Sequence, residues 1–109
     1  MSDYDDARIK AVLLQLGLAM KAGKVQSGEL QAETAVKAMK AFLVIIAGDA
    51  SDNTKKLFTD KCSFYKVPVK ILGTKEILGH AIGKNERSSI AITDEGFAKS
   101  LLKKLTDLE

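Results

Sequence analysis

The longest unbroken apolar run in the sequence extends from Ala41 to Ala47 and is typical of a strand that is buried on both faces. Helical patterns precede and follow it, and further strand-like segments occur at 69–72 and 88–93. Strands that alternate with helices of this length must have helices on both sides of the sheet. The sequence therefore predicts an α/β fold, a three-layer α/β/α sandwich with a small central mixed sheet. A chain of 109 residues, 46% hydrophobic, can bury one core, and we expect a single domain over residues 4–109.

The second helix is predicted from a capping residue and from periodicity. Ser27 has the side chain of a good helix N-cap and precedes a helical pattern from Leu30 to Met39. A short strand at 24–26 leads into this helix. Its expected buried face carries Ala32, Ala35, Val36 and Met39.

The other helices follow from the same reasoning. The first carries apolar residues at helical spacing from Ile9 to Met20, and Gly23 stops it. Pro68 opens an edge-like strand, and Thr74 is expected to cap a short helix that ends at Gly83. Two longer helices have these residues facing inward: Leu57, Phe58, Cys62 and Tyr65 in one, and Phe97, Leu101, Leu105 and Leu108 in the other.

A glycine-bounded segment, Gly23 to Gly28, stands directly before the second helix. A glycine that opens a helix leaves backbone N–H groups unpaired and pointing outward, which favours an anion such as phosphate. A Walker A loop is excluded, because Gly28 is followed by Glu29 and Leu30 instead of Lys and then Ser or Thr. The segment therefore indicates a turn that contacts phosphate without hydrolysing a nucleotide.

Acidic residues at both chain ends lower the net charge of a sequence whose remaining residues are strongly basic. The formal net charge is +3, but residues 7–106 hold all 17 Lys and Arg against only 9 Asp and Glu, a net charge of +8. This excess favours a polyanionic partner, most simply nucleic acid, although lysines that only keep a surface hydrated give a similar count.

Cysteine and histidine occur once each, as Cys62 and His80. A single Cys cannot form an internal disulfide or a Cys-based metal cage, so we expect neither a metal nor another cofactor. A catalytic dyad would require direct contact between the two side chains, for which the sequence gives no reason. The N-terminal Asp3, Asp5 and Asp6 are the reverse of a basic signal-peptide start. We expect a cytoplasmic monomer that contacts no membrane and is not an enzyme.

Three loops are expected to meet at one edge of the sheet: 23–28, 48–53 and 83–89. Ligands of open α/β sheets usually bind at loop clusters of this kind. Lysine and arginine residues in or near the loops could supply phosphate contacts: Lys24, Lys37, Lys84 and Arg87.

Five short motifs follow one another along the chain: Gly23-Lys24…Ser27-Gly28…Gln31, Leu43 to Ala47 with Asp49, Val67-Pro68-Val69, Leu78 to Gly83, and Ile90-Ala91-Ile92. Their order and spacing resemble the kink-turn RNA-binding ribosomal-protein family, which includes the archaeal-type seven-Ae and thirty-e large-subunit ribosomal proteins, and the bacterial ribosomal-protein-like branch is the most similar. The likeness extends from about Ile9 to Phe97. It implies an α/β/α sandwich that grips a sharply bent RNA.

The resemblance also implies which residues contact the RNA. In the family, a glycine at the start of the second helix lets the backbone approach the RNA, and Gly28 matches it. The next positions in the family are often Asn and then Glu or Gln, which read sheared G·A pairs, and a Lys follows one turn on. Here these three positions are Leu30, Gln31 and Thr34. Gln31 keeps an amide that can donate and accept at a base edge, whereas Leu30 and Thr34 lose a polar group and a cation. Asp49 matches an acidic position that in the family helps to hold the missing Lys.

These observations predict a non-enzymatic RNA-binding protein, bacterial and ribosome-associated. It is expected to recognise a kink-turn or internally looped RNA through the start of the second helix and the loop before the last strand. The expected RNA-binding residues are Lys24, Ser27, Gly28, Gln31, Lys37, Asp49, Lys84, Arg87 and Ser88. Two alternatives remain open, a substrate-binding module that acts with an RNA-modifying enzyme and a protein-interaction adaptor that uses the same edge.

Overall fold

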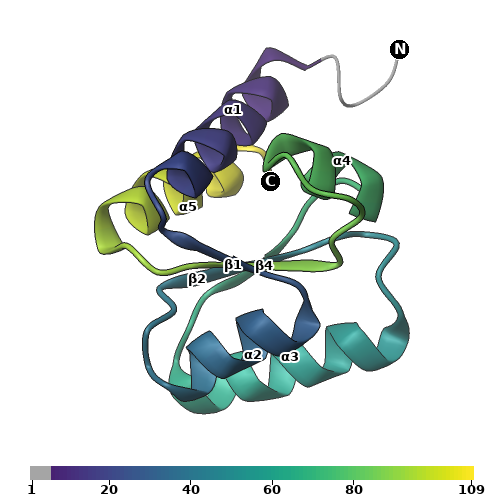
Figure 1. The fold of residues 1–109 in the computed structure, drawn as a ribbon, viewed down its shortest axis with the longest axis vertical. Helices are drawn as coiled ribbons and strands as arrows, with labels where there is room; N and C mark the ends of the chain where they lie inside the picture. Colours follow the sequence, from purple (N-terminus) through teal and green to yellow (C-terminus); the bar gives the residue numbers. More distant parts are fainter. Residues whose placement is uncertain (1–5) are drawn as a thin grey trace.

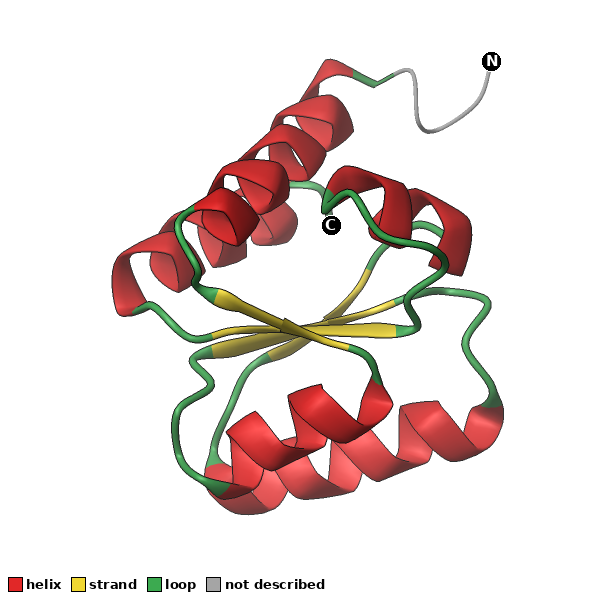
Figure 2. Ribbon diagram, viewed as in Figure 1, coloured by secondary structure: helices red, strands yellow, loops and turns green. Residues whose placement is uncertain are grey.

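Residues 6–109 are described by a computed structural model, in which five helices alternate with four short strands. In chain order the elements are α1 (Ala7–Lys21), β1 (Val25–Ser27), α2 (Glu29–Lys37), β2 (Leu43–Ile46), α3 (Asp52–Tyr65), β3 (Val69–Ile71), α4 (Lys75–Ala81), β4 (Ser89–Ile92) and α5 (Glu95–Asp107). Helices α1, α4 and α5 cover one face of the sheet, and α2 and α3 cover the other (Figures 1 and 2). The predicted three-layer α/β/α sandwich is confirmed.

The sheet is mixed, with the strand order β1-β4-β2-β3. Strand β4 pairs antiparallel with both β1 and β2, whereas β2 and β3 are parallel. All residues of β2 and β4 are buried, as expected for central strands covered on both faces. Strand β3 follows Pro68 and lies at the edge, where a proline nearby disturbs no central ladder.

Side chains from helices on both sides fill the core. The inward faces predicted for α3 and α5 are confirmed for Phe58, Cys62, Leu101 and Leu105, which are buried. The outer members of the same two faces are only partly buried and pack against the core: Leu57, Tyr65, Phe97 and Leu108. The helices therefore bury a narrow stripe each, as amphipathic helices on a small sheet do.

Side-chain caps begin four helices, the first of them α1, where Asp6 accepts from the Arg8 N–H at 2.7 Å. Thr74 caps α4, where its hydroxyl accepts a hydrogen bond from the Ile77 backbone N–H at 3.2 Å, and Gly83 ends this segment with φ 73°. Both features were predicted. Ser51 and Asp94 cap α3 and α5 in the same way, with acceptor distances of 3.1 and 2.9 Å.

The structure corrects two expectations about α2. Ser27 is the last residue of β1, so Gly28 occupies the N-cap position and no side chain caps the helix. The Ser27 hydroxyl accepts a hydrogen bond from Arg87 instead. Met39 does not join the buried face, because the helix ends at Lys37 and Met39, with φ 60°, is 76% exposed.

The segment from Gly23 to Gly28 is not a single turn, contrary to expectation. Strand β1 separates the two glycines and carries them to opposite ends of the sheet. The Thr93 N–H donates to the Lys24 carbonyl just after β4, whereas the Gly28 N–H donates to the Ser89 carbonyl at the start of β4. The predicted loop cluster therefore contains Gly28 but not Gly23.

The loop before β4 packs tightly on α4. A Cβ atom at Gly79 would clash with the carbonyl oxygen of Asn85 and lie 3.0 Å from the Glu86 Cα. The Lys84 N–H donates to the Gly79 carbonyl at 2.8 Å. Gly79 thus allows the loop to approach the helix backbone to backbone.

We expect Gly79→Ala to destabilise the protein by about 1 to 3 kcal/mol, because the added methyl group must displace backbone atoms. The free energy of unfolding in urea, followed by circular dichroism, measures the effect. Gly96→Ala is the matched control in α5, where the new Cβ meets only a side-chain oxygen of Asp94 at 3.3 Å. Alanine favours helix, so this variant should be neutral or up to about 1 kcal/mol more stable. Equal stability of Gly79→Ala and the wild type would contradict the packing described here.

Candidate nucleic-acid interface

One end of the sheet brings together three segments that are distant in sequence. We call the start of α2, the turn after β2 (47–51) and the loop before β4 (83–88) the candidate edge. Backbone hydrogen bonds of 2.9 Å link them, from Gly28 N–H to the Ser89 carbonyl and from Ala47 N–H to the Ser88 carbonyl. All three lie on the right-hand side of Figure 1. The candidate edge is therefore held by the backbone of β4 and its preceding residue.

Gly28 gives α2 an open N-terminus. It has φ 94°, a region that favours glycine, and a Cβ atom here would meet nothing within 4 Å. The first helical bond runs from Ala32 N–H to the Gly28 carbonyl. Within the described residues, the N–H groups of Glu29, Leu30 and Gln31 have no acceptor. The space before three unpaired donors is thus unobstructed, which suits a phosphate.

Arg87 braces the loop at this edge. Its Nε donates to the Ser27 hydroxyl at 3.1 Å, and its Nη1 donates to the carbonyls of Asn85 and Glu86 at 3.3 and 2.9 Å. The Arg87 backbone N–H donates to the Lys75 carbonyl at 3.0 Å. Because Nη2 is the nitrogen not used in these bonds, Arg87 can hold the loop and still offer donors to an anion.

The turn after β2 is tied to its neighbours in a similar way. Asp49 Oδ1 accepts a hydrogen bond from the Lys75 backbone N–H at 2.8 Å, so it joins the turn to the start of α4. The Lys55 ammonium donates to the Gly48 carbonyl at 2.7 Å. Among the described residues, Asp49 forms no ion pair with a lysine of α2, and Thr34 stands where the resemblance implied a Lys partner for it.

The polar residues of α2 differ in what they can offer. Gln31 is exposed in the first turn, and its amide makes no hydrogen bond with the rest of residues 6–109. The Thr34 hydroxyl donates to the Leu30 carbonyl of its own helix at 2.8 Å. Leu30 presents an apolar side chain that is 73% exposed. Gln31 is therefore the side chain of this turn best suited to read a base edge.

The structure places the predicted site residues in two regions. The candidate edge includes or adjoins Ser27, Gly28, Gln31, Asp49, Lys84, Arg87 and Ser88. Lys24 lies before β1 and Lys37 at the last turn of α2, both at the opposite end of the sheet. These two lysines cannot contact a phosphate held at Gly28, and they belong to a separate surface.

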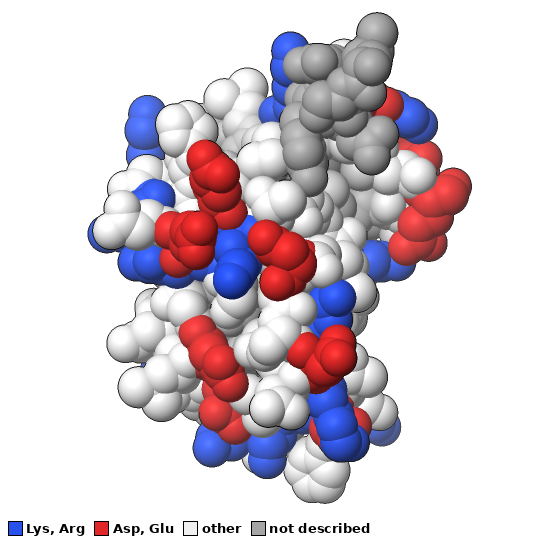
Figure 3. Space-filling view, turned by 90° about the vertical axis from the view of Figure 1, so that its right-hand side faces the viewer, with Lys and Arg blue, Asp and Glu red and all other residues white. Residues whose placement is uncertain are grey.

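Charge at the candidate edge is mixed. Figure 3, which shows this side of the molecule, has acidic and basic side chains interspersed and no continuous basic patch. The acids in and beside the three segments are Glu29, Asp49, Asp52, Glu76 and Glu86, and the bases are Lys55, Lys75, Lys84 and Arg87. The basic excess of the sequence is therefore not concentrated at the candidate edge.

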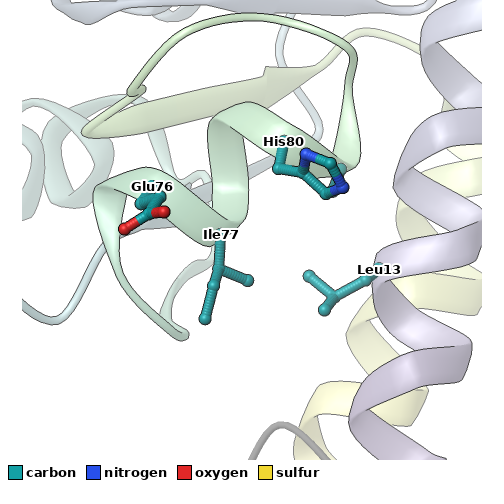
Figure 4. A pocket seen from close by; sticks show the side chains of 5 residues that line it. Leu13, Glu76, Ile77 and His80 are labelled. Carbon is teal, nitrogen blue, oxygen red and sulfur yellow. The ribbon is translucent and has the colours of Figure 1, made fainter.

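Cys62 and His80 cannot form a dyad. Cys62 is buried in α3 on one face of the sheet, and His80 is exposed in α4 on the other. Burial raises the pKa of the Cys62 thiol to about 11. Figure 4 shows His80 beside a hollow of about 390 Å³ that Leu13 and Ile77 line with apolar side chains. Residues 6–109 contain no group of three His, Cys, Asp or Glu side chains that could hold a metal ion.

Comparison with known sequences relates the chain to a family and to two bacterial proteins. The model of the Ribosomal protein L7Ae/L30e/S12e/Gadd45 family matches residues 10–102. RNA-binding protein YlxQ of Bacillus subtilis is 47% identical over 87 residues, which are 80% of this chain and 87% of the relative. RNA-binding protein YlxQ of Enterococcus faecium is 45% identical over 92 residues, 84% of this chain and 87% of the relative. None of these names is that of an enzyme.

Solved structures share the fold. A protein with unknown function from Bacillus halodurans C superposes with a TM-score of 0.85 at 42% identity, over 87% of this chain and 96% of that one. The Giardia lamblia 15.5kD RNA binding protein superposes with a TM-score of 0.78 over 95% of this chain and 92% of that one. At 23% identity, the second likeness bears on the fold alone. Among the helices of residues 6–109, none combines the length and the apolar character needed to cross a bilayer.

We expect Cys62 to resist thiol reagents in the native state, because its side chain is buried and its pKa of about 11 keeps it protonated at pH 8. Labelling with Ellman's reagent should be slow in buffer and complete in urea. Since the pKa is raised on folding, its contribution to stability is full below about pH 9 and is lost as the pH rises toward 11. Rapid labelling of the native protein would contradict this placement.

Proposed function

This chain belongs to the Ribosomal protein L7Ae/L30e/S12e/Gadd45 family, and we propose that it is a non-enzymatic RNA-binding protein that recognises a kink-turn or internally looped RNA. The contacts come from the N-terminus of α2 and the loop before β4. The names of its two YlxQ relatives support RNA as the ligand. In this proposal the protein acts as a monomer in the cytoplasm, in association with the ribosome.

The observation that carries the proposal is the open N-terminus of α2. Three backbone N–H groups lack acceptors within the described residues, and Gly28 leaves the space in front of them empty. Backbone donors at a helix N-terminus bind phosphate without a side chain. The partial positive charge of the helix end adds to this attraction. A phosphate group of the RNA would therefore sit directly before α2.

The mixed charge of the candidate edge favours a bent RNA over a straight duplex. Binding to a uniform duplex depends chiefly on many Lys and Arg contacts with phosphates. Here Glu29 directly follows Gly28, Glu86 is part of the loop before β4, and Arg87 uses much of its guanidinium to brace that loop. A sharply bent strand can bring one phosphate to Gly28 and a base to Gln31 while keeping its other phosphates away from the acids.

A protein-interaction adaptor is the second candidate function. Several large apolar side chains are exposed away from the candidate edge, including Leu14 and Leu18 on α1 and Phe64 on α3. Leu14 and Leu18 are one helical turn apart, so they lie on the same face of α1. Such a stripe is suited to contact another protein. This surface also leaves the candidate edge free, so RNA and protein partners could be held together.

We expect the protein to bind a kink-turn RNA more tightly than a plain duplex of equal length at physiological salt, because the candidate edge is shaped and only weakly basic. Fluorescence anisotropy with end-labelled RNAs measures both dissociation constants. A kink-turn RNA whose sheared G·A pairs are replaced by Watson–Crick pairs is the control for sequence and length. Equal affinity for all three RNAs would contradict the proposed recognition.

Gln31→Ala distinguishes an effect on RNA affinity from an effect on the stability of the fold. The residue is exposed and alanine favours helix, so the free energy of unfolding should change by less than about 0.5 kcal/mol. Affinity for kink-turn RNA should fall by about 1 to 3 kcal/mol if the amide reads a base edge. Gly28→Asp places a carboxylate before α2 and should weaken binding to every RNA. Full affinity of both variants, with the fold intact by circular dichroism, would place the RNA elsewhere.

A further inference from the structure

A hollow of about 200 Å³, lined mainly by residues with polar side chains, lies between the edge strand β1 and helix α2. Residues from both elements and from the segments that follow α2 and β4 line it: Gln26, Gln31, Thr34, Ala35, Lys40 and Thr93. Buried Ala35 is the apolar member of this lining, which otherwise offers two amides, two hydroxyls and an ammonium group. This arrangement combines hydrogen-bonding groups for a base edge with a cation for a phosphate.

Thr34 donates its hydroxyl to the Leu30 carbonyl, but four other side chains of the lining have no internal partner within residues 6–109. In the described part of the chain, Gln26, Gln31, Lys40 and Thr93 use no side-chain atom in a hydrogen bond or ion pair with the protein. Successive residues of a strand point to opposite sides, so Gln26 points away from the side on which its neighbour Val25 is buried, and it is exposed. Glutamine amides on two facing elements can address the donors and acceptors of an unpaired base.

The outer edge of β1 adds backbone groups to this surface. Strand β1 pairs only with β4 among the described strands. The Lys24 carbonyl and the Gly28 N–H form backbone hydrogen bonds with the segment of β4, and in an antiparallel ladder every second residue of a strand faces the partner strand. The N–H and C=O groups of Val25 and Ser27 therefore point away from β4. The hollow is bordered by an unpaired strand edge, where a ligand can add hydrogen bonds.

The end of the hollow away from Gly28 lies near the end of α2 and the start of β1, where Lys40 is a lining residue and Lys24 and Lys37 are close in sequence to the lining. Lys40 lines it, and the Lys24 carbonyl accepts a hydrogen bond from Thr93 of the same lining. Lys37 precedes Lys40 by three residues, and its Nζ lies 3.8 Å from Oε2 of Glu33. Lys24 and Lys40 are exposed and form no ion pair within residues 6–109. We call Lys24, Lys37 and Lys40 the lysine end.

We propose that the hollow binds an unpaired nucleotide next to the kink, with its base between Gln26 and Gln31 and its phosphate at the lysine end. This inference rests on the proposed function, because Gln31 lies in the first turn of α2 and also lines the hollow. A strand whose phosphate sits before Gly28 can thus continue past Gln31 toward Lys40. The hollow is smaller than the roughly 300 to 1,000 Å³ of typical small-molecule sites, which favours one base over a whole cofactor.

The test uses two synthetic RNAs that contain the same kink-turn. One carries three unpaired adenosines on the strand that leaves the kink, and the other ends in a base pair. Gln26→Ala combined with Lys40→Ala should weaken binding of the extended RNA by about tenfold and leave the blunt RNA within about twofold of wild type. Lys40→Ala alone should lower the slope of log affinity against log salt by roughly 0.7 for the extended RNA.

Lys103→Ala is the charge-matched control, because Lys103 is exposed on α5, on the other face of the sheet. It should bind both RNAs as the wild type does. If the double variant binds the extended RNA with wild-type affinity while Gly28→Asp loses binding, the assignment of the hollow as a nucleotide site is overturned and the proposed function stands.

The remaining outcomes also decide between the two proposals. If the double variant loses affinity for the extended RNA although the wild type does not prefer kinked RNA over duplex, the result supports the hollow as a nucleotide site and overturns kink recognition. Equal losses of the double variant for both RNAs would overturn the assignment to an unpaired nucleotide. Failure of the wild type to bind either RNA would overturn both proposals and favour a protein partner for this surface.

Discussion

The pairing of β4 with β1 and β2 is the interaction on which the rest of the structure depends. β4 is the last strand in the sequence but lies between the first two, so its backbone reaches both neighbours. At its start, the carbonyls of Ser88 and Ser89 accept hydrogen bonds from Ala47 and Gly28. The start of α2, the turn after β2 and the loop before β4 are therefore positioned by one strand. Displacement of β4 would separate all three segments.

Geometry and charge are placed at different ends of the molecule. The open N-terminus of α2 lies at the candidate edge, where acids and bases are interspersed (Figure 3). Lys24 and Lys40, which form no ion pair within residues 6–109, lie at the other end of β1 and α2. In the proposed complex, backbone donors would bind a phosphate at Gly28 at short range, whereas the lysines would attract a polyanion over about one Debye length. The proposed nucleotide hollow connects these two surfaces.

Several polar side chains at the candidate edge form hydrogen bonds that hold the loops together, and the sequence alone does not show these bonds. Arg87 braces its own loop through Ser27 and two carbonyls, and Asp49 ties the turn after β2 to the first residue of α4 by accepting from the Lys75 N–H. Substituting either residue would change loop geometry together with any ligand contact. Gln31 has no such internal partner within the described residues, so its substitution reports on binding more cleanly.

The sequence by itself determined the order of the helices and strands, the burial of 43–47 and the capping of α4 by Thr74, because these depend on periodicity and on short-range hydrogen bonds. The resemblance of its motifs also identified the family. Only the tertiary structure decided that Ser27 bonds Arg87 instead of capping α2.

Tertiary structure likewise decided that Gly23 and Gly28 separate and that Lys24 and Lys37 leave the candidate edge. It also brought Gln26, Lys40 and Thr93 to one hollow, although nothing in their spacing along the chain marks them as neighbours. These placements follow from the pairing of β1 with a strand more than 60 residues later, as in the register Val25 to Ile92. Local sequence patterns carry no record of such a register, because it is set by how the whole core packs.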